Sequence, residues 1–222
     1  MVIKLDISKA YDQVEWEFLR HIMLKLGIDA RWVQLAMETV TTTSYSMLIN
    51  GEPKGFIIPS MGIRQGDHLS LYLFRLCAEG LSSLIRKAVE SQSLHVILSC
   101  TNGVCISHLL FADNSFIFCQ ATVKECHHLM NLLECYESAS GQAINRQKTS
   151  IFFSKNTRLE VKQDIWALLG ARIMEDCERY LGLLMVGGKS KVNTPLRIYQ
   201  KKFLIECWDG KKNTFPKQVE RS

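Results

Sequence analysis

The sequence lacks the features that define several classes of protein. No apolar run approaches the roughly 18 residues that a membrane-spanning helix needs, so we expect no membrane partner. No secretory signal precedes the first predicted strand, which favours an intracellular protein. The chain also has no internal repeat and no low-complexity stretch, which speaks against a repeat protein or a disordered one.

The cysteines lack the spacing of a metal or redox site. There are eight of them, and no two form a Cys-x-x-Cys pair. The nearest approaches to a metal cluster are Cys100 and Cys105 with His108, and Cys126 with its two neighbouring histidines. Adjacent residues of a helix point about 100° apart, so neighbouring histidines do not readily converge on one ion. We therefore expect reduced thiols in apolar surroundings rather than zinc ligands.

Neither sign of charge is in large excess. The chain carries 27 Lys and Arg against 22 Asp and Glu, a net charge of +5. This balance fits a nucleic-acid partner, but it is also common in proteins that bind none. Hydrophobic residues make up 47% of the 222 residues, which is enough for a sizeable core. The length predicts one compact domain with an appendage.

Two aspartates lie about a hundred residues apart at the ends of short apolar runs. Asp6 closes a run that begins at Ile3, and Asp113 closes one that begins at Leu109. Each is followed by polar or turn-forming residues, as when a buried strand delivers a carboxylate to a cleft. Two such strands side by side would form a site for Mg²⁺, which is usually held by one or two carboxylates plus substrate phosphates. The pair therefore points to phosphoryl or nucleotidyl transfer.

Hydrophobic periodicity predicts alternating strands and helices. Asp12, with Glu15 three residues later, is typical of a capping box, so we predict Asp12 as a helix N-cap outside the metal site. Asn50-Gly51 predicts one hairpin, and Asp113-Asn114 predicts another. The expected strands cover 2–6, 43–49, 54–58, 104–110, 115–119 and 151–153, and the expected helices cover 16–26, 32–41, 69–89, 123–139 and 159–169.

Five motifs occur in an order that resembles the palm of a reverse transcriptase. They lie at residues 4–12, 62–67, 111–113, 141–148 and 180–182. The chain is similar to the non-LTR, LINE-type retrotransposon family in its plant form, and the resemblance extends to about residue 210. It implies an α+β fold, the ferredoxin-like β-α-β-β-α-β palm, over residues 1–187. Residues 188–222 would then begin a helical thumb or form a tail, with the fingers missing before Asp6.

The resemblance also implies a catalytic apparatus. Asp6 and Asp113 would hold two Mg²⁺ or Mn²⁺ ions for nucleotidyl transfer. Lys148 would protonate the pyrophosphate leaving group as a general acid, although a solvated lysine is an equal alternative from spacing alone. The partners would be an RNA template, a DNA primer and deoxynucleoside triphosphates. By analogy with the family alone, the protein would act in the nucleus.

Further residues would contact the substrate. Tyr11 matches the bulky gate that lies under the incoming sugar and excludes a 2′-hydroxyl, with a core aromatic as the alternative. Arg64, Gln65 and Gly66 would line the nucleotide and template pocket, because glycine lets the backbone approach closely; a plain helix start is the alternative. Phe111 and Ala112 complete the substrate-binding set, and residues 180–182 correspond to the primer-gripping hairpin.

Three positions depart from the family pattern. Asn114 stands where the family usually has a second aspartate, which removes a charge beside the metals. At about 4 Å and an effective dielectric near 20, a pair of unit charges is worth about 4 kcal/mol, so activity could fall by orders of magnitude. His68 and Leu71 replace prolines near a helix start, which should loosen it. The alternative function is therefore a catalytically inactive retroelement fragment with at most weak nucleic-acid binding; a maturase-like splicing factor has no supporting feature.

Overall fold

The computed structural model describes residues 1–98, 105–111, 114–154, 156–173, 179–180 and 183–184. The chain divides into two compact units, Met1–Ile173 and Met174–Ser222. The described part of the first unit contains five helices and a mixed sheet, which confirms the α+β class. The boundary predicted near residue 187 lies outside the described residues and stays a prediction.

The main sheet is built on the first strand of the chain, β1 (Val2–Ser8). β1 lies between β7 (Asn114–Phe118) and β9 (Ser150–Phe152), and it is antiparallel to both. The strand order is β10-β9-β1-β7-β6, with β6 (His108–Phe111) and β10 (Arg172–Ile173) outermost. The short β8 (Ala143–Ile144) pairs with the last two residues of β1. β9 and β10 are parallel, which makes the sheet mixed.

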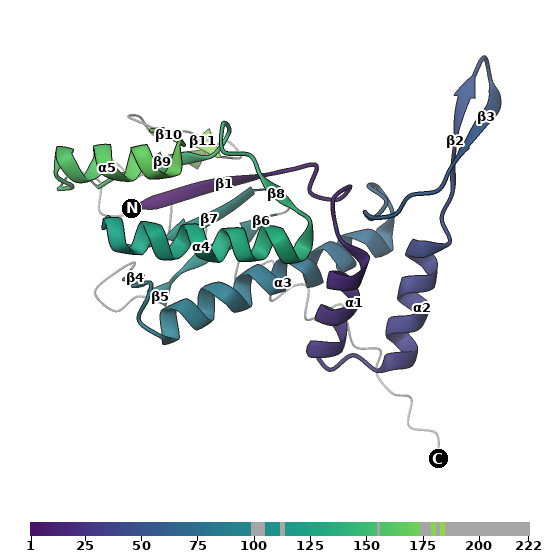
Figure 1. Cartoon of the computed structure of the whole chain (residues 1–222), viewed down its shortest axis with the longest axis horizontal. Coiled ribbons are helices and arrows are strands. Elements are labelled where there is room, and N and C mark those ends of the chain that lie inside the picture. Colours follow the sequence, from purple (N-terminus) through teal and green to yellow (C-terminus); the bar gives the residue numbers. More distant parts are fainter. Residues whose placement is uncertain (99–104, 112–113, 155, 174–178, 181–182, 185–222) are drawn as a thin grey trace. The chain divides into compact units, whose positions relative to one another are not determined.

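One face of this sheet is covered by helices. Burial alternates along β1, with Ile3, Leu5 and Ile7 buried and the residues between them half-buried. This alternation is expected of a strand with one face in the core. Helices α3 (His68–Glu90), α4 (Val123–Ser140) and α5 (Leu159–Leu169) lie on that face (Figure 1). Their apolar side chains form one core cluster with those of the sheet.

A second apolar cluster joins two further helices to α3. Helices α1 (Trp16–Lys25) and α2 (Ala30–Thr41) contribute side chains such as Leu19 and Val33 to this cluster, which also includes Leu73 and Phe74 of α3. Fully burying one such side chain contributes roughly 1.5–3 kcal/mol. This cluster includes Ile7 and Ala10, so it connects the end of β1 to the first half of α3.

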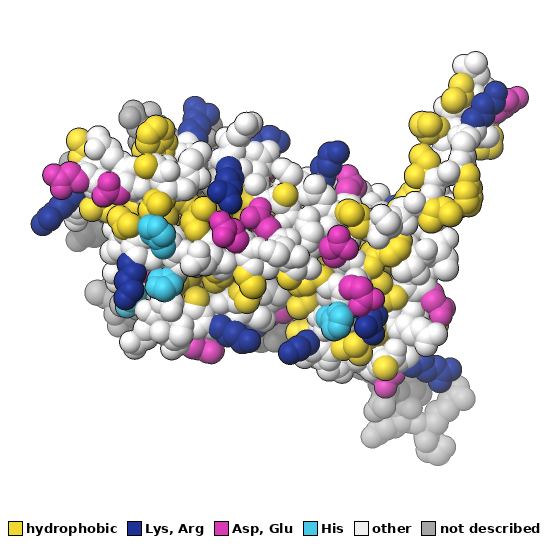
Figure 2. Space-filling model, in the orientation of Figure 1, with side chains coloured by type: hydrophobic (Ala, Val, Ile, Leu, Met, Phe, Trp, Pro, Cys, Tyr) yellow, Lys and Arg dark blue, Asp and Glu magenta, His cyan; other side chains and the backbone are white. Residues whose placement is uncertain are grey.

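In the described part of the chain, three two-stranded sheets are separate from the main sheet. β2 (Tyr45–Ile49) and β3 (Glu52–Ile57) are exposed throughout, with several apolar side chains at the surface (Figure 2). Asn50 and Gly51 both have positive φ, so they form the hairpin turn that the dipeptide predicted. β4 (Ile97–Leu98) pairs with β5 (Cys105–Ile106), and in the second unit β11 (Arg179–Tyr180) pairs with β12 (Leu183–Leu184).

The first helix starts at Trp16, as predicted, but its N-cap is not Asp12, so that part of the prediction is wrong. The N-cap of α1 is Glu15, and the N–H of Asp12 instead donates to the carbonyl of Lys9 at 2.9 Å in a turn. The carbonyls of Tyr11 and Val14 accept hydrogen bonds from residues 62 and 63, which holds this stretch outside the helix. Long-range contacts therefore override the local capping pattern.

The other elements agree with the prediction to within a few residues. α5 was predicted over its observed range, and α3 extends the predicted range by one residue at each end. The two-residue strands β4, β8 and β10 were not predicted, because so short a stretch has no periodicity. Residues 104–110 were expected to form one strand, but the described part of this segment has two, β5 and β6.

Most of the described cysteines are buried free thiols, as expected. Cys77, Cys119 and Cys126 are buried, and Cys135 is exposed. Burial raises the pKa of Cys77 and of Cys119 to about 12, so both remain protonated at neutral pH.

No helix in the described part of the chain is both long and apolar enough to cross a membrane.

Candidate nucleotide pocket and metal-binding strand

Asp6 lies near the end of the central strand, on the face opposite the helices. It shares that face with the other half-buried residues of β1, because side chains alternate along a strand. Its direct partner in the register of β7 is Asn114. Asp113 precedes Asn114 in the sequence, but it lies outside the described residues, as does Ala112. Phe111 ends β6 and pairs with Asn114 in the backbone register.

The surroundings of Asp6 fit a divalent ion. Its carboxylate is half-buried at the strand end, so it can supply a hard oxygen ligand while an ion there keeps some of its water. Among the residues that the structure describes, no three His, Cys, Asp or Glu side chains gather into a metal cluster. Mg²⁺ is usually held by one or two carboxylates together with substrate phosphates and water, so the single carboxylate described here is compatible with such a site.

The chain leaves β1 through a sharp turn that carries Tyr11. We call residues 9–15 the Tyr11 loop. Lys9 has a φ of 44°, a left-handed conformation that is uncommon for residues other than glycine. The carbonyl of Lys9 accepts hydrogen bonds from the N–H groups of Asp12 and Gln13, which closes the turn. A conformation of this kind persists only where surrounding contacts hold it.

One set of those contacts comes from the segment before α3. The N–H of Ile63 donates to the carbonyl of Tyr11 at 2.9 Å, and the N–H of Gly62 donates to that of Val14 at 2.8 Å. In the other direction, the indole Nε1–H of Trp16 donates a hydrogen bond to the carbonyl of Gly62 at 2.7 Å. These three bonds fix the segment that leads into Gln65 against the Tyr11 loop.

A second set comes from the end of α4. The side-chain Nε2 of Gln142 donates to the carbonyl of Ala10 at 2.6 Å, and the N–H of Glu15 donates to the carbonyl of Ser140 at 2.9 Å. The N–H of Ala143 donates to the Oε1 of Gln13 at 3.2 Å. The Tyr11 loop is therefore held from both sides by segments distant in sequence.

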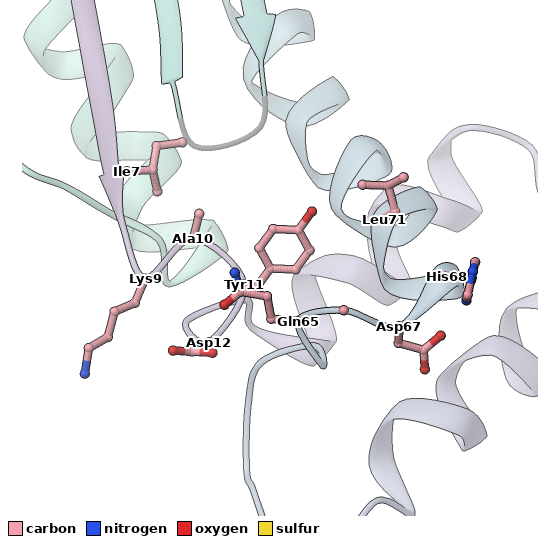
Figure 3. Close-up of a pocket in the computed structure, with 10 residues that line it drawn as sticks. Ile7, Lys9, Ala10, Tyr11, Asp12, Gln65, Asp67, His68 and Leu71 are labelled. Atoms are coloured by element: carbon pink, nitrogen blue, oxygen red, sulfur yellow. The ribbon is translucent and has the colours of Figure 1, made fainter. Parts of the chain in front are cut away.

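The loop and the start of α3 enclose a pocket of about 560 Å³ (Figure 3). The ring of Tyr11 lies between the Ala10 turn and Leu71 of α3, and the side chain of Lys9 points away from it. The pocket has the size of a typical small-ligand site. Its lining is formed by Ile7, Lys9, Ala10, Tyr11, Asp12, Gln65, Gly66, Asp67, His68 and Leu71.

Tyr11 is fixed by stacking as well as by its backbone. Its ring lies parallel to that of Phe74, with a centroid separation of 4.5 Å and an interplanar angle of 14°. Phe74 is itself buried in the cluster that joins α1, α2 and α3. Offset stacking of this kind contributes about 0.5–1.5 kcal/mol beyond burial. Tyr11 is thus both a wall of the pocket and a contact of the core, so the two interpretations of this residue are compatible.

The structure brings together three of the predicted substrate residues. Tyr11, Gln65 and Gly66 all line the pocket, whereas Arg64 is exposed and is not part of its lining. Gly66 has a φ of 91°, so the turn before α3 favours glycine there. Asp67 caps α3 by accepting from the N–H of Leu69 at 2.9 Å, which confirms that the motif opens a helix.

Lys148 is exposed in a turn near the end of β1. Its N–H donates to the carbonyl of Asn145 at 3.2 Å, and the N–H of Asn145 donates to the carbonyl of Asp6 at 2.8 Å. These backbone bonds connect the turn of Lys148 to the strand that carries Asp6. The predicted catalytic residues that the structure describes therefore belong to adjoining backbone segments.

Sequence reasoning missed the structural role of Gln142. It was part of a motif, yet nothing in its spacing showed that its side chain is buried, at 1% exposed, against the Tyr11 loop. It also missed His68 and Leu71 as pocket residues, because they were considered only as missing prolines. The available signal for Gln142 was its position directly after the helix-ending Gly141, where a chain often turns back toward the core.

Comparison with known proteins identifies the family. A model of the family described as reverse transcriptase (RNA-dependent DNA polymerase) matches residues 1–184. Because this match covers most of the chain, the chain belongs to the reverse transcriptase family. Members of this family generally use divalent metal ions, which agrees with the carboxylate at the end of β1.

Two relatives narrow the assignment. The chain is 26% identical over 147 residues to the retrovirus-related Pol polyprotein from type-1 retrotransposable element R2 of Popillia japonica, covering 66% of this chain and 23% of that protein. It is 53% identical over 68 residues to an uncharacterized mitochondrial protein of Arabidopsis thaliana, covering 31% of this chain and 56% of the relative. The alignments thus span less than two thirds of either relative. They confirm the non-LTR, LINE-type assignment that the motifs indicated.

Proposed function

We propose that the chain is the palm of an RNA-directed DNA polymerase, with the ferredoxin-like arrangement of that domain. The carrying observation is the shared location of Tyr11, Gln65 and Gly66 in one pocket at the end of the strand that bears Asp6. The proposed substrates are an RNA template, a DNA primer and a deoxynucleoside triphosphate. The products would be extended DNA and pyrophosphate, and the nucleus is the proposed place of action.

Asp6 and Asp113 are the proposed ligands of Mg²⁺ or Mn²⁺. Bound ions would activate the primer 3′-hydroxyl and neutralise charge on the triphosphate. The protein contributes mainly by holding the reacting groups in line, since positioning and electrostatics supply most of the rate in such reactions. The rigid support of Asp6 is consistent with this task, because β1 is paired on both sides.

The pocket is proposed to hold the sugar and base of the incoming nucleotide. Tyr11 would lie beneath the sugar and exclude a 2′-hydroxyl, while Gln65 and Gly66 would contact the nucleotide and template from the α3 side. Phe111 and Ala112 are proposed neighbours of the same substrate, and Arg64, exposed beside Gln65, is a proposed template contact. Lys148 is proposed to donate a proton to the leaving pyrophosphate.

Primer extension tests this function directly. Purified protein is given an RNA template, a DNA primer and deoxynucleotides, with Mg²⁺ or Mn²⁺, and is compared with Asp113→Ala and Asn114→Asp. We expect extension that disappears in Asp113→Ala and increases in Asn114→Asp, which adds a charge at the register position opposite Asp6. Silence in all versions, with the fold intact by circular dichroism, would instead favour a fragment that only binds nucleic acid.

The role of Tyr11 predicts a change in sugar selectivity. Tyr11→Ala is expected to raise incorporation of ribonucleotides relative to deoxynucleotides by at least about tenfold, because the ring that blocks the 2′-hydroxyl is removed. The measurement is kcat/KM for each nucleotide in single-nucleotide extension. The matched control is Tyr72→Ala, which removes a tyrosine that is 64% exposed on α3 and outside the pocket lining. An equal loss of selectivity in both variants would contradict the gate.

A further inference from the structure

The side chain of Gln142 forms a buried polar link between α4 and the Tyr11 loop. It is 1% exposed, and a buried amide is costly unless its polar atoms are hydrogen-bonded. Its Nε2 donates to the carbonyl of Ala10 at 2.6 Å, and its Oε1 accepts from the hydroxyl of Tyr136. Because a carbonyl can only accept, the Ala10 contact requires the NH₂ group on that side and so fixes the orientation of the amide.

Tyr136 is itself held in place. It lies on α4 at 2% exposed, and its ring makes an edge contact with Phe18 of α1 at a centroid separation of 5.9 Å. Burial raises the pKa of Tyr136, so its hydroxyl keeps the proton that it donates to Gln142. The link therefore runs from a rigid helix, through two side chains, to one backbone carbonyl.

The carbonyl of Ala10 lies directly before Tyr11, a residue that lines the pocket. It belongs to the peptide that joins Ala10 to Tyr11, so its orientation constrains the backbone of Tyr11 on the N-terminal side. The carbonyl on the other side of Tyr11 accepts from the N–H of Ile63. The two peptides that flank Tyr11 are thus fixed by hydrogen bonds from different segments, one before α3 and one after α4.

We propose that Gln142 is a positioning residue that sets sugar selectivity by fixing the Ala10–Tyr11 peptide. This inference rests on the proposed function, because it assumes that Tyr11 meets the sugar of an incoming nucleotide. Gln142 does not line the pocket, so it would not contact the bound nucleotide or the reacting atoms directly. It acts through Tyr11, whose ring shifts when the peptide is released.

The test compares two variants that cut the link at different points. Gln142→Met keeps the length of the side chain but removes its donor, and Tyr136→Phe keeps the donor but removes the hydroxyl that orients it. We expect Gln142→Met to raise KM for deoxynucleotides and to reduce discrimination against ribonucleotides, each by about three- to tenfold, as for one lost hydrogen bond. kcat stays within about twofold, and Tyr136→Phe has a smaller effect of the same sign.

The control is Ile165→Val, a substitution at a fully buried position of α5 in the sheet core. It removes one buried methylene and so destabilises the fold modestly, but it should leave KM and discrimination unchanged. The proposal is overturned if Ile165→Val changes sugar selectivity as much as Gln142→Met does. It is also overturned if the parent protein discriminates against ribonucleotides and neither link variant changes that discrimination. Should Gln142→Met fail to fold, Tyr136→Phe carries the comparison.

A second readout does not depend on activity. Hydrogen exchange is measured by mass spectrometry on peptides that cover residues 9–15, where the N–H groups of Asp12 and Gln13 bond to Lys9. Exchange there should accelerate in both link variants and not in Ile165→Val. If the parent protein incorporates no nucleotide, but the Tyr11 loop exchanges faster in both link variants than in the parent, the proposed function fails while the positioning role of Gln142 stands. Unchanged exchange in both link variants would refute the positioning itself.

Discussion

Replacing Asp6 with asparagine is expected to reduce nucleotide incorporation by about a thousandfold while the fold survives. The reason is electrostatic: a pair of unit charges about 4 Å apart is worth about 4 kcal/mol at an effective dielectric near 20, which corresponds to about three orders of magnitude in rate, and a divalent ion makes this a lower bound. The fold should tolerate the change because Asp6 is half-buried and lies on the face of β1 opposite the apolar core. Single-nucleotide primer extension measures the rate, and thermal unfolding measures stability.

The matched control for this prediction is Asp29→Asn. Asp29 caps α2 by accepting from the N–H of Arg31, and asparagine is about as good an N-cap as aspartate. It lies outside the pocket lining, so the control removes the same charge without touching the proposed site. The role of Asp6 as a metal ligand would be refuted if Asp6→Asn kept its activity within tenfold of that of the control.

Gly62→Ala is expected to lower the free energy of unfolding by about 3 kcal/mol or more. Gly62 has a φ of 88°, and a Cβ there would lie 2.5 Å from the carbonyl oxygen of Asp12 and 2.9 Å from its carbon. The strained backbone alone costs of order 1–3 kcal/mol. Because the contact is with backbone, relief requires the Tyr11 loop to move, which also breaks the hydrogen bonds of residues 62 and 63. Urea denaturation measures the loss.

Gly27→Ala separates the two causes of that loss. Gly27 has a similar φ of 80°, but a Cβ there would meet nothing within 4 Å. We expect this control to cost about 1 kcal/mol, which is the effect of backbone strain without a clash. If both substitutions cost the same, the close approach of Gly62 to the Tyr11 loop makes no contribution of its own.

Local patterns predicted the regular elements because those elements depend on local chemistry. α5 and α3 carry apolar residues at helical spacing over many turns, and the Asn50-Gly51 turn favours positive φ at both positions. The N-cap of α1 could not be predicted in this way. Asp12 stays outside the helix because Tyr11 and Val14 accept hydrogen bonds from residues 63 and 62, far away in the sequence, and no local signal carries that information.

The sequence predicted the residues of the candidate site, but it did not predict the contacts that hold the Tyr11 loop in place. The sequence singled out the motif around Asp6 and the motif around Gln65, and the structure brings Tyr11 of the first motif to the second. The anchoring of the Tyr11 loop by Gln142 depends on a side chain reaching a carbonyl 132 positions earlier. Such a contact follows from how β1, β8 and α4 pack together, which a single sequence does not reveal.

The position of β1 at the centre of the sheet also determines the order in which the protein can fold. β1 is synthesised before its partners β7, β8 and β9, which follow more than 100 residues later. Contacts of such long range slow folding, because the chain loses the entropy of loop closure before the strands gain the stabilisation of pairing. Until then the apolar side chains of Ile3, Leu5 and Ile7 stay exposed on a nascent chain and invite association. The nucleotide pocket, anchored by residues 140–143, is therefore assembled late, after nearly the whole first unit has been synthesised.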